Sequence, residues 1–239
     1  YLTQSGTRDA RPSVPLMRVL PSGVKEMLSL DIGNPTSMAV GPDGLVYVSS
    51  RFDGHVYRLT SEDRVERYAS ELGVATGLAF SPDGDLFVGD RSGTIFRVRP
   101  DRQVETYATL PASVAAFHLV FGPDQCLYVT APTLATHDAL YRVTPERLVD
   151  PVVETFGRPQ GLAFDATGTL YVVDALAGAA GLYCVDVTVE QPVPELVVAA
   201  ASLVGVAFDR GGRAALAASD TVWTLDGMLD APIRTVENA

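Results

Sequence analysis

Residues 77–98 read GLAFSPDGDLFVGDRSGTIFRV, and this stretch decides the fold. A short apolar run, GLAF, leads into the turn sequence SPDG. The run DLFVGD follows with the alternating apolar pattern that is typical of a β-strand. Aspartate and glycine favour a tight connection between two strands, and a loop then leads to a third run, TIFRV. The stretch therefore predicts three short antiparallel strands.

The same pattern recurs along the whole chain. Its turn segments begin at residues 41, 81, 122, 165 and 209, which are 40 to 44 residues apart. A fourth, more polar run, such as VERYAS at 65–70 or VETYAT at 104–109, closes each repeat. Convincing helical periodicity is absent from the sequence. Four antiparallel strands in a repeat of this length predict the blade of a β-propeller.

The repeats predict an all-β fold, a six-bladed β-propeller of four-stranded antiparallel blades with one blade incomplete in this chain. Five blades are complete in the sequence, over residues 34–72, 73–111, 112–156, 157–200 and 201–239. Residues 1–33 form part of the sixth, with 15–23 matching a third strand, 24–31 a fourth and the first four residues the end of a second. We expect one propeller domain over 1–239, completed by residues before Tyr1 or by another chain.

Aromatic residues recur at one position of the second strand in each repeat. They are Tyr47, Phe87, Tyr128 and Tyr171. We expect them to pack between neighbouring blades, because aromatic residues supply large buried area in a core.

The composition limits the classes of partner. The net charge is −11, and an acidic chain repels nucleic acid and anionic lipid. No apolar run is long enough to span a membrane. We therefore expect a soluble protein whose partner is a protein or a small-molecule ligand. The localisation is open. One alternative is export, with a signal segment that is absent from this sequence.

The repeat resembles that of the NHL-repeat and senescence-marker-protein/gluconolactonase-like six-bladed propellers. The resemblance is carried by residues 73–100, GVATGLAFSPDGDLFVGDRSGTIFRVRP, and by residues 157–186, GRPQGLAFDATGTLYVVDALAGAAGLYCVD. It covers nearly the whole chain and implies the fold. It implies no single activity, because this group contains lactonases, other hydrolases, lyases and binding modules.

The lactonase branch of this group implies a divalent metal, often calcium, at one mouth of the central channel. Its ligands are a glutamate, an asparagine and an aspartate that precede innermost strands. Gln160 matches the asparagine and Val204 matches the aspartate, while the glutamate would come from a first strand, and the incomplete blade lacks its first strand in this sequence. The other ring positions are Thr36, Thr76 and Phe117. Because calcium requires several oxygen ligands and negative charge, the sequence predicts a broken metal site. Calcium or another divalent metal stays open, with Gln160, Asp90 and Asp174 as candidate ligands.

A second set of polar residues is expected at the same mouth of the channel. In each blade the first two strands are antiparallel, so the end of the second strand lies beside the start of the first. Asp90 and Asp174 end second strands, and two histidines lie near the same end. A channel mouth with convergent polar groups is the default place for a ligand. The predicted pocket contains Thr36, Thr76, Asp90, His118, His137, Gln160 and Asp174. The alternative for both aspartates is structural, since aspartate caps turns by accepting backbone N–H groups.

Three functions remain open at this point. The first is an NHL-like binding or scaffold module with a polar pocket at the channel mouth. The second is a metal-dependent lactonase or hydrolase of the gluconolactonase-like group, which requires Asp90 and Asp174 to converge. The third is an accessory subunit in which another chain completes the sixth blade by adding a strand. No nucleophile, phosphate-binding or dinucleotide-binding motif selects among them, and no cofactor is assigned.

Overall fold

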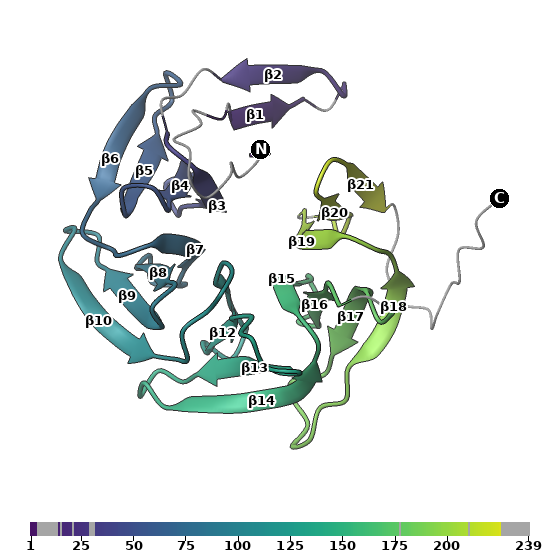
Figure 1. Cartoon of the computed structure of the whole chain (residues 1–239). Coiled ribbons are helices and arrows are strands. Elements are labelled where there is room, and N and C mark those ends of the chain that lie inside the picture. The colour runs from purple at the N-terminus through teal and green to yellow at the C-terminus, as the bar shows by residue number, and fades with distance from the viewer. Residues whose placement is uncertain are drawn as a thin grey trace. The chain divides into compact units, whose positions relative to one another are not determined.

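A computed structural model describes residues 1–3, 14, 16–20, 22–28, 32–176, 178–209 and 211–225. The chain divides into two compact units, Tyr1–Ala112 and Ser113–Ala239. Each unit is built from antiparallel sheets whose strands pair in chain order (Figure 1). The predicted fold class is confirmed: an all-β propeller of four-stranded antiparallel blades with one incomplete blade. Among the described residues, no helix is long and apolar enough to cross a membrane.

The first unit contains two complete blades. One blade consists of β3 (Pro35–Val40), β4 (Val46–Ser50), β5 (His55–Leu59) and β6 (Val65–Ala69). The next consists of β7 (Ala75–Phe80), β8 (Leu86–Asp90), β9 (Thr94–Val98) and β10 (Val104–Thr109). These strands agree with the runs that the repeat pattern predicts, because period-two alternation and Gly-containing turns are local signals.

A two-stranded sheet precedes these blades in the chain. It pairs β1 (Leu16–Val19) with β2 (Lys25–Leu28). Leu2 and Met17 exchange two backbone hydrogen bonds of 2.8 Å, so the start of the chain lies along the other edge of β1. This arrangement agrees with the prediction that residues 1–33 supply parts of the second, third and fourth strands of an incomplete blade.

The second unit contains two four-stranded blades and a third with three described strands. The first has β11 (His118–Phe121), β12 (Leu127–Thr130), β13 (Asp138–Val143) and β14 (Val149–Phe156). The second has β15 (Pro159–Phe164), β16 (Leu170–Asp174), β17 (Gly181–Val185) and β18 (Glu195–Ala199). The third has β19 (Leu203–Phe208), β20 (Ala214–Ala218) and β21 (Val222–Leu225). The fourth strand expected at 232–236 lies outside the described residues.

The recurring aromatic residues pack between blades within each unit. Each predicted tyrosine meets a phenylalanine at the end of the next innermost strand. The ring centroids are 4.8 Å apart for Tyr47 and Phe80, 5.3 Å for Tyr128 and Phe164, and 5.1 Å for Tyr171 and Phe208. The prediction of inter-blade packing is confirmed for these three tyrosines. Phe87 also contacts Tyr107 of its own blade, at 4.8 Å.

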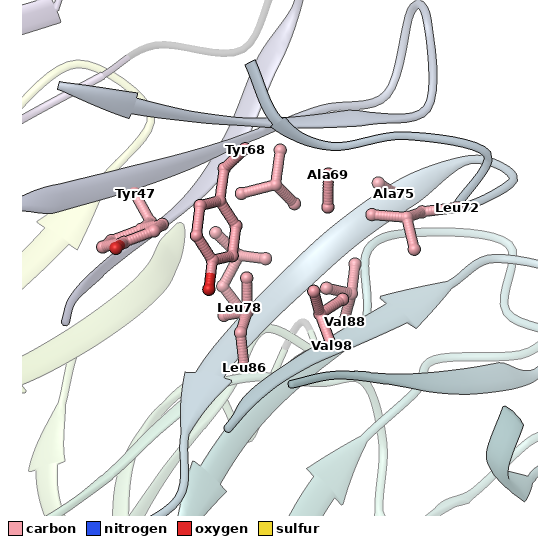
Figure 2. Close-up of a cluster of buried hydrophobic side chains, with 10 residues drawn as sticks. Tyr47, Tyr68, Ala69, Leu72, Ala75, Leu78, Leu86, Val88 and Val98 are labelled. Atoms are coloured by element: carbon pink, nitrogen blue, oxygen red, sulfur yellow. The ribbon is translucent and has the colours of Figure 1, made fainter. Parts of the chain in front are cut away.

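Figure 2 shows the hydrophobic cluster that joins the two complete blades of the first unit. Leu72 lies in the connection between β6 and β7 and is 0% exposed. It packs in a cluster with Leu86, Val88 and Val98, all of which are also fully buried. The connection between the blades is therefore part of the core.

Replacement of Leu72 by alanine should lower the free energy of unfolding by about 2–5 kcal/mol, because it leaves a cavity in this cluster. Urea denaturation checks this value. Leu134, which is 89% exposed, provides the control, since Leu134→Ala should change stability by less than about 0.5 kcal/mol. Equal losses in the two variants would contradict the position of Leu72 in the core.

Candidate functional site

The innermost strands share a local irregularity at the positions predicted to face the channel. The pairing of β3, β7, β15 and β19 with the following strand changes register near the start of each. The residues within these shifts include Thr36, Thr76, Gln160 and Val204. A β-bulge re-aims a side chain, and bulges are frequent beside functional sites. Four of the five ring positions inferred from sequence therefore share a repeated backbone geometry, whereas β11, which follows Phe117, pairs without a register shift.

The two threonines of the first unit use their hydroxyl groups within the fold. Thr76 is buried, and its hydroxyl donates to the carbonyl of Gly89 at 2.9 Å. The half-buried Thr36 donates to the carbonyl of Asn34 at 3.3 Å. These side chains present neutral oxygens and carry no charge for a cation.

Asp90 connects the loop before β7 to the end of β8. The side chain is only 5% exposed, and its carboxylate accepts the N–H of Val74 at 2.7 Å and the hydroxyl of Ser92. Gly73, with a φ of +62°, makes this approach possible. A Cβ at Gly73 would lie 2.6 Å from the carboxylate carbon, so a larger residue would displace Asp90.

Asp174 has the corresponding position in the second unit. It is 3% exposed and accepts three backbone N–H groups, from Gly157 at 2.7 Å, Arg158 at 2.8 Å and Leu176 at 3.0 Å. Bonds to an ionised acceptor are stronger than neutral ones. The carboxylate thus connects the loop before β15 to the end of β16. The contacts of both aspartates are those of the structural alternative, in which a carboxylate caps a turn of its own blade.

Asp138 is a further buried carboxylate that was not among the residues predicted from sequence. It begins β13 and accepts the N–H of Thr133 at 2.9 Å and its hydroxyl at 2.6 Å. In this blade Ala131 follows the second strand where other blades have aspartate. The aspartate just before the run ALYRV was the available signal, because an aspartate at the end of a loop accepts nearby backbone N–H groups.

His118 and Gln160 lie together in the second unit. They belong to β11 and β15, the innermost strands of adjacent blades, and the Gln160 side chain is close enough to the imidazole of His118 to raise its pKa, which burial lowers by more. The backbone carbonyl of Gln160 accepts the hydroxyl of Thr130 at 2.5 Å, which joins β12 to β15. The Nε2 atom of His118 is buried and has no hydrogen-bond partner among the described residues. Burial lowers the pKa of His118 to about 4, so the imidazole is neutral at pH 7.

The remaining predicted residues do not join this pair. His137 is exposed in the loop between β12 and β13, and Val204 is 42% exposed. The fully buried Phe117 offers no oxygen or nitrogen from its side chain. The first unit holds Thr36, Thr76 and Asp90, and the second holds His118, His137, Gln160 and Asp174. Of these, the structure brings His118 and Gln160 into direct contact.

The family resemblance implies a calcium site, and its ligands would have to come from the side chains described above. Within the described parts of the chain, no three or more His, Cys, Asp or Glu residues are grouped to hold a metal ion. Both candidate carboxylates already accept backbone N–H groups, and Gln160 is neutral beside a neutral imidazole. Calcium requires six to eight oxygen ligands, usually with carboxylates among them. The residues present do not fit such a site.

No family model and no curated protein matches this sequence. Solved structures with similar folds include a gluconolactonase from Xanthomonas campestris, at 16% identity and a TM-score of 0.73 over 95% of this chain and 84% of that one. A virginiamycin B lyase from Staphylococcus aureus is 14% identical with a TM-score of 0.65, over 94% of this chain and 79% of that one. A chain of a nidogen–laminin complex is 16% identical with a TM-score of 0.74, over 94% and 87%. These similarities show the propeller fold, which different functions share.

The desolvated imidazole of the half-buried His118 predicts a specific pH dependence of stability. The pKa of His118 falls from 6.5 to about 4 on folding, so the unfolded chain binds more protons below pH 6.5. Stability should therefore decrease as the pH falls from 6.5 toward 4. His118 should account for a loss of about 2 kcal/mol between pH 8 and pH 5.

Urea denaturation at both pH values measures this effect in the wild type and in His118→Gln. The variant should lose about 2 kcal/mol less than the wild type over this range. His137→Gln, which changes an exposed histidine, should behave like the wild type. Equal losses in His118→Gln and the wild type would contradict the burial of His118.

Proposed function

We propose that this chain is a β-propeller binding module that holds a ligand through a polar pocket on its innermost strands. One observation carries the proposal: Asp90 and Asp174 are buried acceptors of backbone N–H groups in their own blades. A general acid, a general base or a metal ligand has to reach the substrate or the ion. Asp90 is committed to one backbone N–H group and one hydroxyl, and Asp174 to three backbone N–H groups, so both carboxylates are poorly placed for these roles.

The chemistry of the pocket supports a neutral polar ligand. The unpartnered Nε2 of His118 requires a donor or an acceptor, depending on the tautomer of the ring. The amide of Gln160 offers both kinds of group beside it. A buried polar atom that lacks a partner is costly, so a ligand that supplies one gains affinity. Hydroxyl and amide groups match this requirement.

A metal-dependent lactonase is the second candidate. The position of Gln160 favours it, because this residue stands where the resembling lactonases have a metal-binding asparagine and retains an amide oxygen. The chain also shares its fold with a gluconolactonase from Xanthomonas campestris. Because Asp90 and Asp174 are occupied by their own blades, a lactonase would require a different carboxylate that is free to bind the ion.

Elemental analysis and a hydrolysis assay separate the two candidates. Protein purified without chelator should contain calcium and zinc well below one ion per chain. It should not hydrolyse glucono-1,5-lactone above the uncatalysed rate when calcium is added. One ion per chain that is lost in Gln160→Ala, together with calcium-dependent hydrolysis, would establish the lactonase candidate instead.

Binding at the pocket is measured through the imidazole signals of the three histidines by nuclear magnetic resonance. The signal of His118 is assigned by its loss in His118→Gln, with His137→Gln as the matched control. Neutral polyols and primary amides serve as probes. At least one probe should shift the His118 signal in a saturable way, and Gln160→Ala should weaken that binding. A His118 signal that no probe shifts would contradict the proposed pocket.

A further inference from the structure

A second cavity lies in the first unit, at the opposite end of the strands from Thr36, Thr76 and Asp90. It has a volume of about 340 Å³ and opens among the turns that follow β3, β7 and β9. This volume is at the lower end of the range for small-molecule sites. All of its lining residues lie between Pro42 and Arg102, so the cavity belongs to this unit alone.

Two arginines line this cavity and share one counter-ion. The guanidinium carbon of Arg102 lies 5.2 Å from the ring centre of Tyr68, and that of Arg58 lies 6.0 Å from it. Glu66 accepts a hydrogen bond from each, at 2.6 Å from Arg58 and at 3.2 Å from Arg102. One carboxylate therefore faces two positive charges.

Two further acidic residues, Asp43 and Asp83, line the cavity, and Asp43 is largely committed to contacts of its own turn. Asp43 accepts the hydroxyl of Tyr47 at 2.9 Å and the N–H of Leu45 at 3.1 Å. Its contact with Arg58 is long, at 3.5 Å. Asp43 thus holds the turn and the tyrosine in place and neutralises Arg58 only weakly.

The arginine pair has donor groups to spare. The Nε atom of Arg58 is buried and has no hydrogen-bond partner among the described residues. The side chain of Arg102 is 49% exposed, and the hydrogen bond to Glu66 uses a single terminal nitrogen. Each guanidinium has five N–H donors in a planar fork. A ligand that completes this set brings acceptor oxygens, and a carboxylate fits the fork with two of them.

The rest of the lining combines apolar rings with one further acidic residue, Asp83. Phe80 and the rings of Pro42, Pro82 and Pro100 line it, together with the edges of two tyrosines. The rings of Tyr47 and Tyr68 meet edge to face, with centroids 4.9 Å apart, and Figure 2 shows them side by side at one end of the buried cluster. Apolar surface beside a pair of cations suits an organic acid better than an inorganic anion.

The second unit shows which parts of this cavity come from the repeat. Asp124, Tyr128 and Arg142 reproduce Asp43, Tyr47 and Arg58, and the tyrosine hydroxyl again donates to the aspartate, at 3.0 Å. The strand register places Val152 where the first unit has Tyr68. The turn that corresponds to residues 99–102 contains no arginine in the β15–β18 blade. The equivalent place beside Asp124, Tyr128 and Arg142 therefore has no counterpart of Tyr68 or of Arg102.

We propose that this cavity binds a small organic carboxylate, whose oxygens bond Arg58 and Arg102 while its apolar body lies against Phe80 and the prolines. A free acid and the carboxyl terminus of a peptide offer the same chemistry. The site is independent of the pocket formed by His118 and Gln160, so the failure of one proposal leaves the other unaffected.

Isothermal titration calorimetry at low salt tests the ligand class with phenylacetate as the probe. One saturable site is expected, and added salt should weaken it. Acetate lacks the apolar body and 2-phenylethanol lacks the charge, so each should bind at least about tenfold more weakly. N-acetyl-Leu-Phe, which ends in a carboxylate, and its carboxamide distinguish a free acid from a peptide carboxyl terminus as the ligand. A site for peptide termini should bind N-acetyl-Leu-Phe more tightly than phenylacetate and should bind the carboxamide weakly. Binding of 2-phenylethanol as tight as that of phenylacetate would overturn the proposal.

Substitution of Arg102 tests the site itself. Arg102→Gln should weaken phenylacetate binding at least about tenfold, and Arg102→Lys should weaken it less. The matched control is Arg147→Gln. Arg147 lies in the turn between β13 and β14, as Arg102 lies in the turn between β9 and β10, and the substitution removes one positive charge there. The two arginines have similar backbone conformations, with φ of 68° and 70°. Both variants should keep the wild-type melting temperature. Equal affinities of Arg102→Gln and Arg147→Gln for phenylacetate would contradict the site.

Discussion

The structure of each unit depends on the burial of second-strand tyrosines by the next blade. A blade alone leaves this aromatic surface in water, because its own strands cover only one side of the ring. Tyr47, Tyr128 and Tyr171 are covered by a phenylalanine of the following innermost strand. A side-chain hydrogen bond of 2.5 Å accompanies two of these contacts, from Ser49 to the carbonyl of Thr76 and from Thr130 to that of Gln160.

These contacts position the candidate site. The hydrogen bond from Thr130 holds the backbone of Gln160 against β12, and His118 is paired with Thr130 in the adjacent strand. Gly161 allows the innermost strands β15 and β19 to approach, since a Cβ there would lie 2.6 Å from the Cα of Gly205. The pair of His118 and Gln160 therefore results from the packing of adjacent blades. Thr130 contacts the backbone of Gln160 and is the strand partner of His118.

The fold was predictable from the sequence because its signals are local. Strand alternation, turn residues and a repeat of 40 to 44 residues lie within one blade, and they recur often enough to be recognised. The roles of Asp90 and Asp174 were less predictable. A carboxylate at the end of a strand has the same sequence signature whether it caps a turn or binds a ligand, and only the identity of its donors separates the two.

Other features depended on contacts between distant residues. Nothing in the sequence indicated that His118 would be buried against Gln160, because this contact joins strands of adjacent blades. The cavity with Arg58 and Arg102 combines three turns that are separated by tens of residues. Such combinations appear only after the blades are assembled.

The central claim is that the carboxylates at the ends of the second strands, Asp90 and Asp174, are structural caps that fix the loops of their own blades. The most direct measurement is the free energy of unfolding of Asp174→Ala by urea denaturation. Loss of an acceptor for three backbone N–H groups should cost roughly 3 kcal/mol. Asp186→Ala is the control: this exposed carboxylate accepts only the N–H and the hydroxyl of Thr188, so its loss should lower the free energy of unfolding by much less. A stability of Asp174→Ala equal to that of the wild type would contradict the account and make Asp174 available for binding or catalysis.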